Sequence, residues 1–217
     1  MNPPFTTGQF LKVFENYNTS VFPMQIVFYL LCTFVIYLAL KKKSYRTINS
    51  LLAFFWLWMG VVYHIMFFTS INTAAYAFGI LFIVQSFVIL FFGVFRTEMS
   101  YSFSKDIYGY AGILLFVYSL VIYPLIGFIL GHVYPSSPTL GLPCPTTIFT
   151  FGVFLWSDKK FPLVILIIPF IWSIIGFTAV LNFGIKEDSG LLVAGVLALI
   201  MLLFKNKKYT SVSLQQN

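Results

Sequence analysis

The feature that most constrains the fold of this chain is a series of long apolar runs separated by short polar loops. A helix needs about 20 mostly apolar residues to cross the hydrocarbon core of a bilayer. Only 9% of the 217 residues are charged and 59% are hydrophobic, whereas a soluble domain is about 25% charged. The runs near spanning length are 22–40, 49–68, 74–95, 108–132, 143–156, 161–181 and 189–204. We therefore predict an all-α, polytopic membrane bundle of seven transmembrane helices.

The distribution of basic residues predicts how this bundle is oriented. Only Lys12 and Lys186 fall in the N-terminal segment and the even-numbered connections. The other basic residues fall in the odd-numbered connections and the C-terminal tail: Lys41, Lys42, Lys43, Arg46, Arg96, Lys105, Lys159, Lys160, Lys205, Lys207 and Lys208. Because cytoplasmic loops carry the excess of Lys and Arg, we predict an external N-terminus and a cytoplasmic C-terminus. The net charge of +7 then indicates membrane topology and not nucleic-acid binding.

The N-terminal residues differ from the apolar runs because they form an amphipathic pattern. Thr6 or Thr7 can cap a helix whose apolar side chains fall on one face, namely Phe10, Val13, Phe14 and Tyr17. Such a helix is expected to lie in the membrane interface as an anchor, which is the favoured interpretation, or to cover the mouth of the bundle. The predicted organisation is an outer-face amphipathic segment at 1–20, a single transmembrane bundle at 21–204 and a basic cytoplasmic tail at 205–217.

Ionisable residues inside a membrane are costly and usually functional. No Asp, Glu, Lys or Arg lies in the middle of a predicted span. This argues against a proton pump with a buried carboxylate and against a voltage sensor. The last run has no lysine for a retinal Schiff base. The acidic residues Glu187 and Asp188 fall in the loop between the last two spans and are expected at the outer face.

The remaining polar residues point to a site on the outer side. His64 lies in the outer third of the second predicted span, His132 at the outer end of the fourth, and Cys144 at the outer start of the fifth. The candidate ligand-binding residues are His64, Asn72, Gln85, His132, Cys144 and Thr147, and the candidate metal ligands are His64, His132 and Cys144. The alternatives remain open: His64 can donate to a carbonyl across a helix interface, and His132 can be an ordinary interfacial residue.

The stretch GLPCPTTIFTFG at 141–152 predicts a broken fifth helix. Pro145 suits the first helical position, and Pro143 favours extended geometry before it. A helix from about Pro145 to Trp156 spans about 18 Å, short of a hydrocarbon core of about 30 Å. Its N-terminus is therefore expected below the outer surface, where the helix dipole would favour a Cys144 thiolate, a soft-metal ligand. The alternative is that the prolines only shape a loop and the threonines bond back to the preceding turn.

Three segments carry a resemblance to a known family: PFTTGQFLKVFENYN, WLWMGVVYHIMFFTSINTAAYAFG and PTLGLPCPTTIFTFG. They resemble an uncharacterised family of bacterial multi-pass membrane proteins, a domain of unknown function, over nearly the whole chain. The resemblance implies a multi-pass protein of the bacterial inner (plasma) membrane and implies no activity or site residue. Thr73 stands where the family is expected to have proline, which affects only local loop geometry.

Four functions are compatible with these residues. The favoured hypothesis is a transporter or binding protein for a small molecule or soft metal ion, with an outward-facing site at the broken helix. A second is a haem-binding or thiol redox protein that uses His64, His132 or Cys144. A third is an enzyme with a Cys144 nucleophile, for which no orienting group is evident apart from Glu187 or Asp188; a non-enzymatic role is favoured. The fourth is a structural or accessory membrane subunit, and the oligomeric state stays open.

Overall fold

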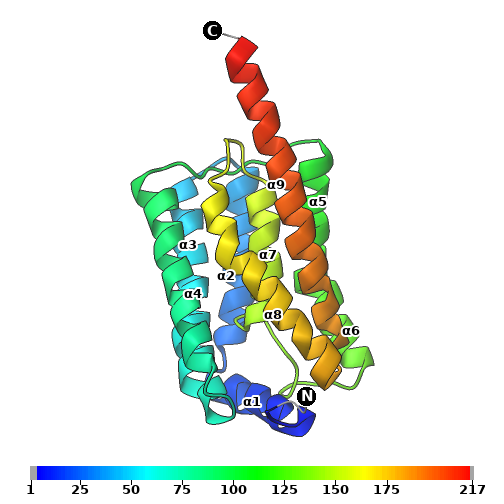
Figure 1. The fold of residues 1–217 in the computed structure, drawn as a ribbon. Helices are drawn as coiled ribbons and strands as arrows, with labels where there is room; N and C mark the ends of the chain where they lie inside the picture. The colour runs from blue at the N-terminus through cyan, green and yellow to red at the C-terminus, as the bar shows by residue number, and fades with distance from the viewer. Residues whose placement is uncertain (1–3, 216–217) are drawn as a thin grey trace.

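The computed structural model describes residues 4–215, with side chains described through residue 210. Its described part is all-helical, and most helices run along one bundle axis, with α1 lying across one end and α9 extending past the other (Figure 1). The elements are α1 (Thr7–Ser20), α2 (Met24–Leu40), α3 (Tyr45–Trp58), η1 (Met59–Phe67), η2 (Phe68–Ser70), α4 (Ala75–Leu90), η3 (Phe91–Phe95), α5 (Ile107–Val117), η4 (Tyr118–Ile122), α6 (Tyr123–Ile129), α7 (Pro143–Leu155), η5 (Leu163–Leu166), α8 (Ile167–Phe183), η6 (Lys186–Asp188) and α9 (Ser189–Gln215).

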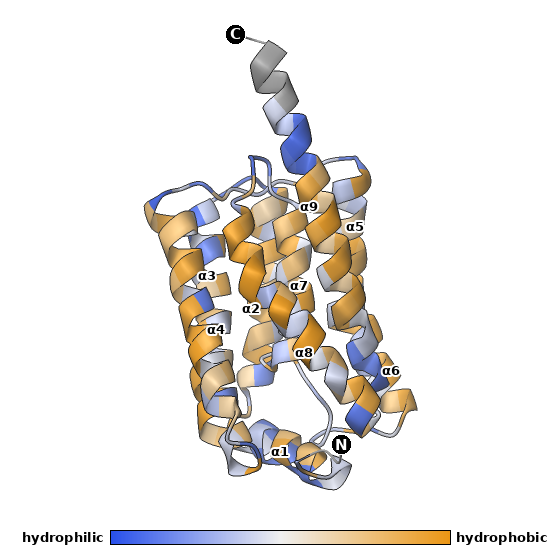
Figure 2. Cartoon of the chain, in the orientation of Figure 1, coloured by the Kyte–Doolittle hydropathy of each residue, from blue (hydrophilic) through white to orange (hydrophobic). Residues whose placement is uncertain are grey.

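Several continuous helical segments are long and apolar enough to cross a membrane. Within the described residues there are five: Tyr45–Ser70, Ala75–Phe95, Ile107–Ile129, Leu163–Phe183 and Lys186–Thr210. The pair α1 and α2, bent by 82°, is a sixth if it counts as one span, and α7 is a shorter apolar helix. Apolar residues cover the length of the bundle, whereas polar segments gather at its two ends (Figure 2). This surface indicates an association with lipid.

The short helix α7 lies in the interior of the bundle. Every residue from Pro145 to Leu155 is buried, so α7 has no lipid-facing side. The helix begins at Pro143, two residues before the predicted start, because a proline in the first turn gives up no intrahelical hydrogen bond. Leu142, the residue before it, is extended with φ −92° and ψ 154°, as a following proline favours. The N-terminus of α7 is therefore buried among other elements.

Lys205 of α9 caps the C-terminal end of α7. Its ammonium group donates to the carbonyl oxygen of Leu155 at 3.0 Å and lies 4.8 Å from the ring centroid of Tyr108. A cation at a helix C-terminus satisfies a free carbonyl and complements the helix dipole. The sequence analysis placed Lys205 at the start of the cytoplasmic tail, whereas its side chain is packed into the bundle with 8% exposure.

Three spans contain π-helical segments, which the sequence pattern did not predict. These segments are η1, η3 and η4. Pro124 follows η4 in the first turn of α6. A π-helical turn accommodates the missing proline N–H by shifting the hydrogen-bond register. In η1 the widened turn buries both Tyr63 and His64 in the bundle.

The N-terminal helix α1 covers one end of the bundle. The predicted cap is Thr6, whose hydroxyl accepts from the backbone N–H of Gln9 while the Gln9 side chain accepts from Thr6. The apolar face of α1 is buried, and the ring of Phe10 contacts those of Phe68 and Phe183 at centroid distances of 5.7 and 5.1 Å. Of the two interpretations of the amphipathic pattern, the packing favours the cover.

Candidate binding site

A cavity of about 170 Å³ lies under α1 at the buried start of α7. Its volume is sufficient for about ten water-sized groups. The walls come from many parts of the fold, with aromatic side chains prominent among them. The lining residues used below are Phe10, Phe14, Tyr63, Phe78, Tyr123, Cys144, Trp172, Gly176, Ala179 and Asp188. The cavity thus joins the broken helix to α1, η1, α8 and η6.

The floor of the cavity is formed by Cys144 of α7 and Trp172 of α8. Both lie close to Gly176: a Cβ there would lie 3.5 Å from the sulfur and 3.6 Å from the indole nitrogen, and it would clash with Leu191 at 2.6 Å. The Trp172 side chain is 7% exposed, and its N–H has no oxygen or nitrogen acceptor among the described residues; the Cys144 sulfur, a weak acceptor, lies within its reach. A buried donor without a strong acceptor is costly, so this N–H marks a position where a ligand atom could accept a hydrogen bond.

The acidic residue of the cavity is Asp188, which is 2% exposed. Tyr123 donates its hydroxyl to Oδ1 at 2.5 Å, and the Cys144 thiol lies within hydrogen-bonding reach of the same carboxylate. The ion pairs between described residues do not include Asp188. Asp188 lies in the predicted connection between the last two long helices, as the last residue of the turn η6, but its side chain is buried in the bundle and does not face solvent.

Glu187 forms a second acidic position beside the cavity. Its side chain is fully buried, and its Oε1 lies 2.8 Å from Nδ1 of His132. Its Oε2 has no hydrogen-bond partner among the described residues. Tyr118 holds the backbone by donating to the Glu187 carbonyl at 2.8 Å. His132 is therefore neither a lipid-facing interfacial residue nor a free ligand, because its ring is paired with a buried carboxylate.

His64 is enclosed by aromatic rings. It is completely buried, and neither ring nitrogen has a hydrogen-bond partner within the described residues. Its ring centroid lies 4.7 Å from that of Phe82 and 5.1 Å from that of Trp172. The expected bond to a backbone carbonyl is not seen. His64 thus lies behind the Trp172 wall of the cavity and does not line it.

The three candidate metal ligands do not share one centre. His64 is enclosed by rings, His132 pairs with Glu187, and Cys144 lies by Asp188. In the part of the chain that the structure describes, no three His, Cys, Asp or Glu side chains are grouped so that they could hold a metal ion. Of the three, Cys144 alone lines the cavity; the His64 ring contacts the lining residue Trp172, and His132 pairs with Glu187, the neighbour of the lining residue Asp188.

The other candidate residues separate into different environments. Asn72 lines the cavity, and its Oδ1 accepts from the N–H of Ala74 at 3.0 Å. Gln85 lies outside the cavity and donates to the carbonyl of Ile165 at 2.9 Å. Thr147 is buried with no partner among the described residues and does not line the cavity.

The roles of the neighbouring threonines are structural. Thr150 donates to the carbonyl of Thr146 one turn earlier, and Thr146 accepts from the N–H of Gly141. The bond of Thr150 agrees with the alternative interpretation of the GLPCPTTIFTFG stretch, whereas Thr146 fixes the loop before α7.

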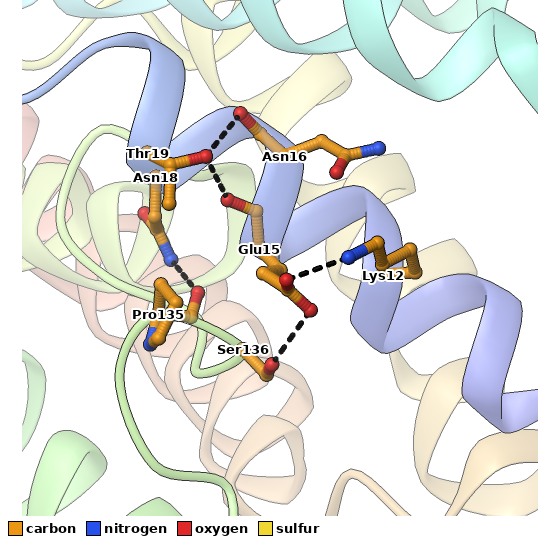
Figure 3. Close-up of polar contacts among 7 residues, drawn as sticks. All are labelled: Lys12, Glu15, Asn16, Asn18, Thr19, Pro135 and Ser136. Carbon is orange, nitrogen blue, oxygen red and sulfur yellow. Dashed lines mark hydrogen bonds and ion pairs between the residues drawn. The ribbon is translucent and has the colours of Figure 1, made fainter.

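Side-chain bonds attach α1 to the loop that precedes α7. The Nδ2 of Asn18 donates to the carbonyls of Pro135 and Ser137 at 2.7 and 2.8 Å. Figure 3 shows Asn18 and Glu15 directed from α1 toward this loop. Glu15 accepts from Ser136 at 3.5 Å and pairs with Lys12 at 2.6 Å. The cover and the loop at the start of α7 therefore form one connected wall.

Sequence reasoning missed the buried acids. The available signal was the order Glu-Asp-Ser-Gly before an apolar run, since acidic residues favour the first turn of a helix. That signal predicts a helix start but not burial, which depends on Tyr118, Tyr123 and His132 from other elements.

This chain belongs to DUF6064, a family of unknown function, whose profile matches residues 7–213. No curated protein matches the chain. No solved structure matches it either. The match agrees with the resemblance seen in the sequence. Because the family has no known function, the functional proposal rests on the chemistry of the cavity.

Proposed function

We propose that this protein is an integral membrane protein that binds a small molecule in the cavity at the start of α7. The observation that carries the proposal is that two polar groups line one cavity with aromatic walls. They are the Trp172 N–H, which has no oxygen or nitrogen acceptor among the described residues, and the Asp188 carboxylate. Ligand sites in proteins are typically apolar cavities with a few polar groups that fix orientation. Polar groups left unsatisfied in a membrane interior are otherwise costly.

The proposed topology has seven passes, with an external N-terminus and a cytoplasmic C-terminus. Polar segments lie at both ends of the bundle, and the basic part of α9 lies at the end opposite α1 (Figure 2). In this topology α7 passes through the interior of the protein, which relieves its 13 residues of the need to span lipid alone. The cavity then faces outward under α1. The charge distribution and the family resemblance support the bacterial inner membrane as its location.

A small-molecule ligand is favoured over a soft metal ion or haem. Near the Cys144 sulfur the carboxylate of Asp188 is the second donor, and His64 and His132 are held elsewhere. A metal ion held by protein side chains needs three or four such donors around it. Transport is the finer hypothesis: it requires that α1 move aside, whereas binding requires only the cavity itself.

The test uses three probes of nearly equal shape: choline, its neutral analogue 3,3-dimethylbutan-1-ol, and the anion 3,3-dimethylbutanoate. Binding to the full chain in lipid nanodiscs is measured by ligand-observed NMR and titration calorimetry. Ala179→Leu places a larger side chain in the cavity wall and is expected to reduce binding at least tenfold. Ala77→Leu, at an exposed position on α4, is the matched control and is expected to have no effect. The proposal fails if none of the probes binds, or if both variants bind as the wild type does.

A further inference from the structure

The charges around the cavity are unbalanced. Among the described residues, no Lys, Arg or His lines it, whereas the carboxylate of Asp188 does. Glu187, the preceding residue, is also buried, and the His132 ring is the group paired with it. Tyr118 donates to the backbone carbonyl of Glu187 and Tyr123 to the Asp188 carboxylate, and a tyrosine hydroxyl supplies no positive charge. The cavity is thus an acidic environment without a fixed counter-ion.

Hydrogen bonds satisfy the Asp188 carboxylate only in part. Tyr123 and Cys144 can donate to it, but these bonds do not fully replace the hydration that an ionised carboxylate loses on burial, and a positive charge nearby would stabilise that ionised form. None of the protein's ion pairs between described residues supplies that charge. A cationic group on a ligand would supply it at the position where the cavity is open.

The other walls of the cavity also suit a cation. The rings of Tyr63, Phe78 and Trp172 line it, and the Phe78 and Trp172 ring centroids lie 5.6 Å apart at an angle of 70°. Aromatic faces attract organic cations, and recognition of quaternary ammonium groups typically uses several rings together. An inorganic cation fits less well, because Ca²⁺ and Mg²⁺ require several oxygen ligands and these walls are mainly carbon.

The N–H of Trp172 is a second polar group in the cavity wall. It is more than nine-tenths buried, and its only acceptor among the described residues is the weakly accepting Cys144 sulfur. An oxygen on the ligand, close to its cationic group, would accept this hydrogen bond. The two polar groups therefore select opposite features, a positive charge at Asp188 and an acceptor at Trp172.

We propose that the cavity at the start of α7 binds a small organic ammonium compound with a hydroxyl or carbonyl oxygen, with Asp188 as counter-ion and the aromatic walls around the cation. This inference rests on the proposed small-molecule function and specifies the ligand class of the same site. The available volume of about 170 Å³ limits the ligand to a compact molecule of about ten non-hydrogen atoms.

The decisive comparison is between choline and 3,3-dimethylbutan-1-ol, which differ mainly in charge. The charge of choline is independent of pH, so protonation of the probe does not affect the result. We expect wild-type protein to bind choline at least tenfold more tightly than the neutral analogue, and to bind 3,3-dimethylbutanoate most weakly. Equal or tighter binding of the neutral analogue would overturn the inference and leave the small-molecule function standing, whereas no binding of any probe would end both.

Asp188→Asn removes the negative charge of this side chain and nearly keeps its shape. It is expected to lower choline affinity at least tenfold and to change affinity for the neutral analogue less than threefold. Asp158→Asn, the same substitution at an exposed residue after α7, is the control and should change neither. If Asp188→Asn does not fold, Trp172→Phe tests the second contact: it keeps a ring but removes the N–H, and should weaken both choline and the neutral analogue. Unchanged binding of both probes to Trp172→Phe would contradict the proposed acceptor contact.

Discussion

Asn18 holds the cover of the cavity in place, and Asn18→Ala is predicted to loosen it. The side chain is completely buried. It donates to two carbonyls of the loop before α7, and its Oδ1 accepts from Thr139 at 2.8 Å and from Gln25 at 3.2 Å. Each bond contributes about 1 kcal/mol net, and water can reach some of the freed groups. We expect the substitution to reduce the free energy of α1 opening by about 2–4 kcal/mol.

Hydrogen exchange measured by mass spectrometry on the full chain in nanodiscs reports this opening directly. If α1 opens locally, a loss of about 2–4 kcal/mol accelerates exchange of its amides by roughly 30- to 1000-fold. Amides in α4 and α7 are expected to keep their wild-type rates. The effect should therefore map to one helix and not to the whole bundle.

Two variants at neighbouring positions test the reasoning. Asn16→Ala changes the same residue type on the exposed side of α1 and should leave exchange unchanged. Asn18→Asp keeps the size of the side chain but replaces the two N–H donors with an oxygen that faces two carbonyls, so it should accelerate exchange at least as much as Asn18→Ala. Equal exchange rates in Asn18→Ala and Asn16→Ala would refute the role assigned to these hydrogen bonds.

Three further predictions concern elements around the site. Gly141→Ala should destabilise the fold by about 1–3 kcal/mol in thermal unfolding, because Gly141 has φ +92° and a Cβ there would lie 2.9 Å from the Phe28 ring. Lys205→Met should cost about 1–2 kcal/mol, measured in the same way, because it removes the cation at the Leu155 carbonyl. Burial raises the pKa of Asp106, but hydrogen bonds from the start of α5 and a nearby lysine outweigh this and hold that pKa below its ordinary value. The stabilisation it contributes is therefore complete above about pH 4 and is lost as the pH falls further, so the stability difference between wild type and Asp106→Asn should shrink below that pH.

The site could be predicted from the sequence only in part. The prolines at 143 and 145 predicted a helix that starts inside the protein, and α7 is buried from its first residues. Charge and helix depth placed His132 and Cys144 at one level, and both lie beside the Glu187–Asp188 pair. Gln85 was predicted to belong to the site because it is polar and lies in the middle of a span, but its amide donates to the carbonyl of Ile165 outside the cavity. Local patterns give the depth of a side chain along a helix, whereas its partner depends on how the helices are rotated against one another.

The amino-acid sequence by itself determined the helical character of the chain and its association with lipid, because apolar runs of this length cannot be hydrated and must satisfy their backbone internally. Only the tertiary structure decided which polar groups meet. It turned the acidic residues before α9 inward, enclosed His64 in aromatic rings and set α1 over the cavity. These features depend on contacts between residues more than 50 positions apart, such as Asn18 with Pro135 and Tyr123 with Asp188. Such contacts arise from packing, which no local sequence pattern encodes.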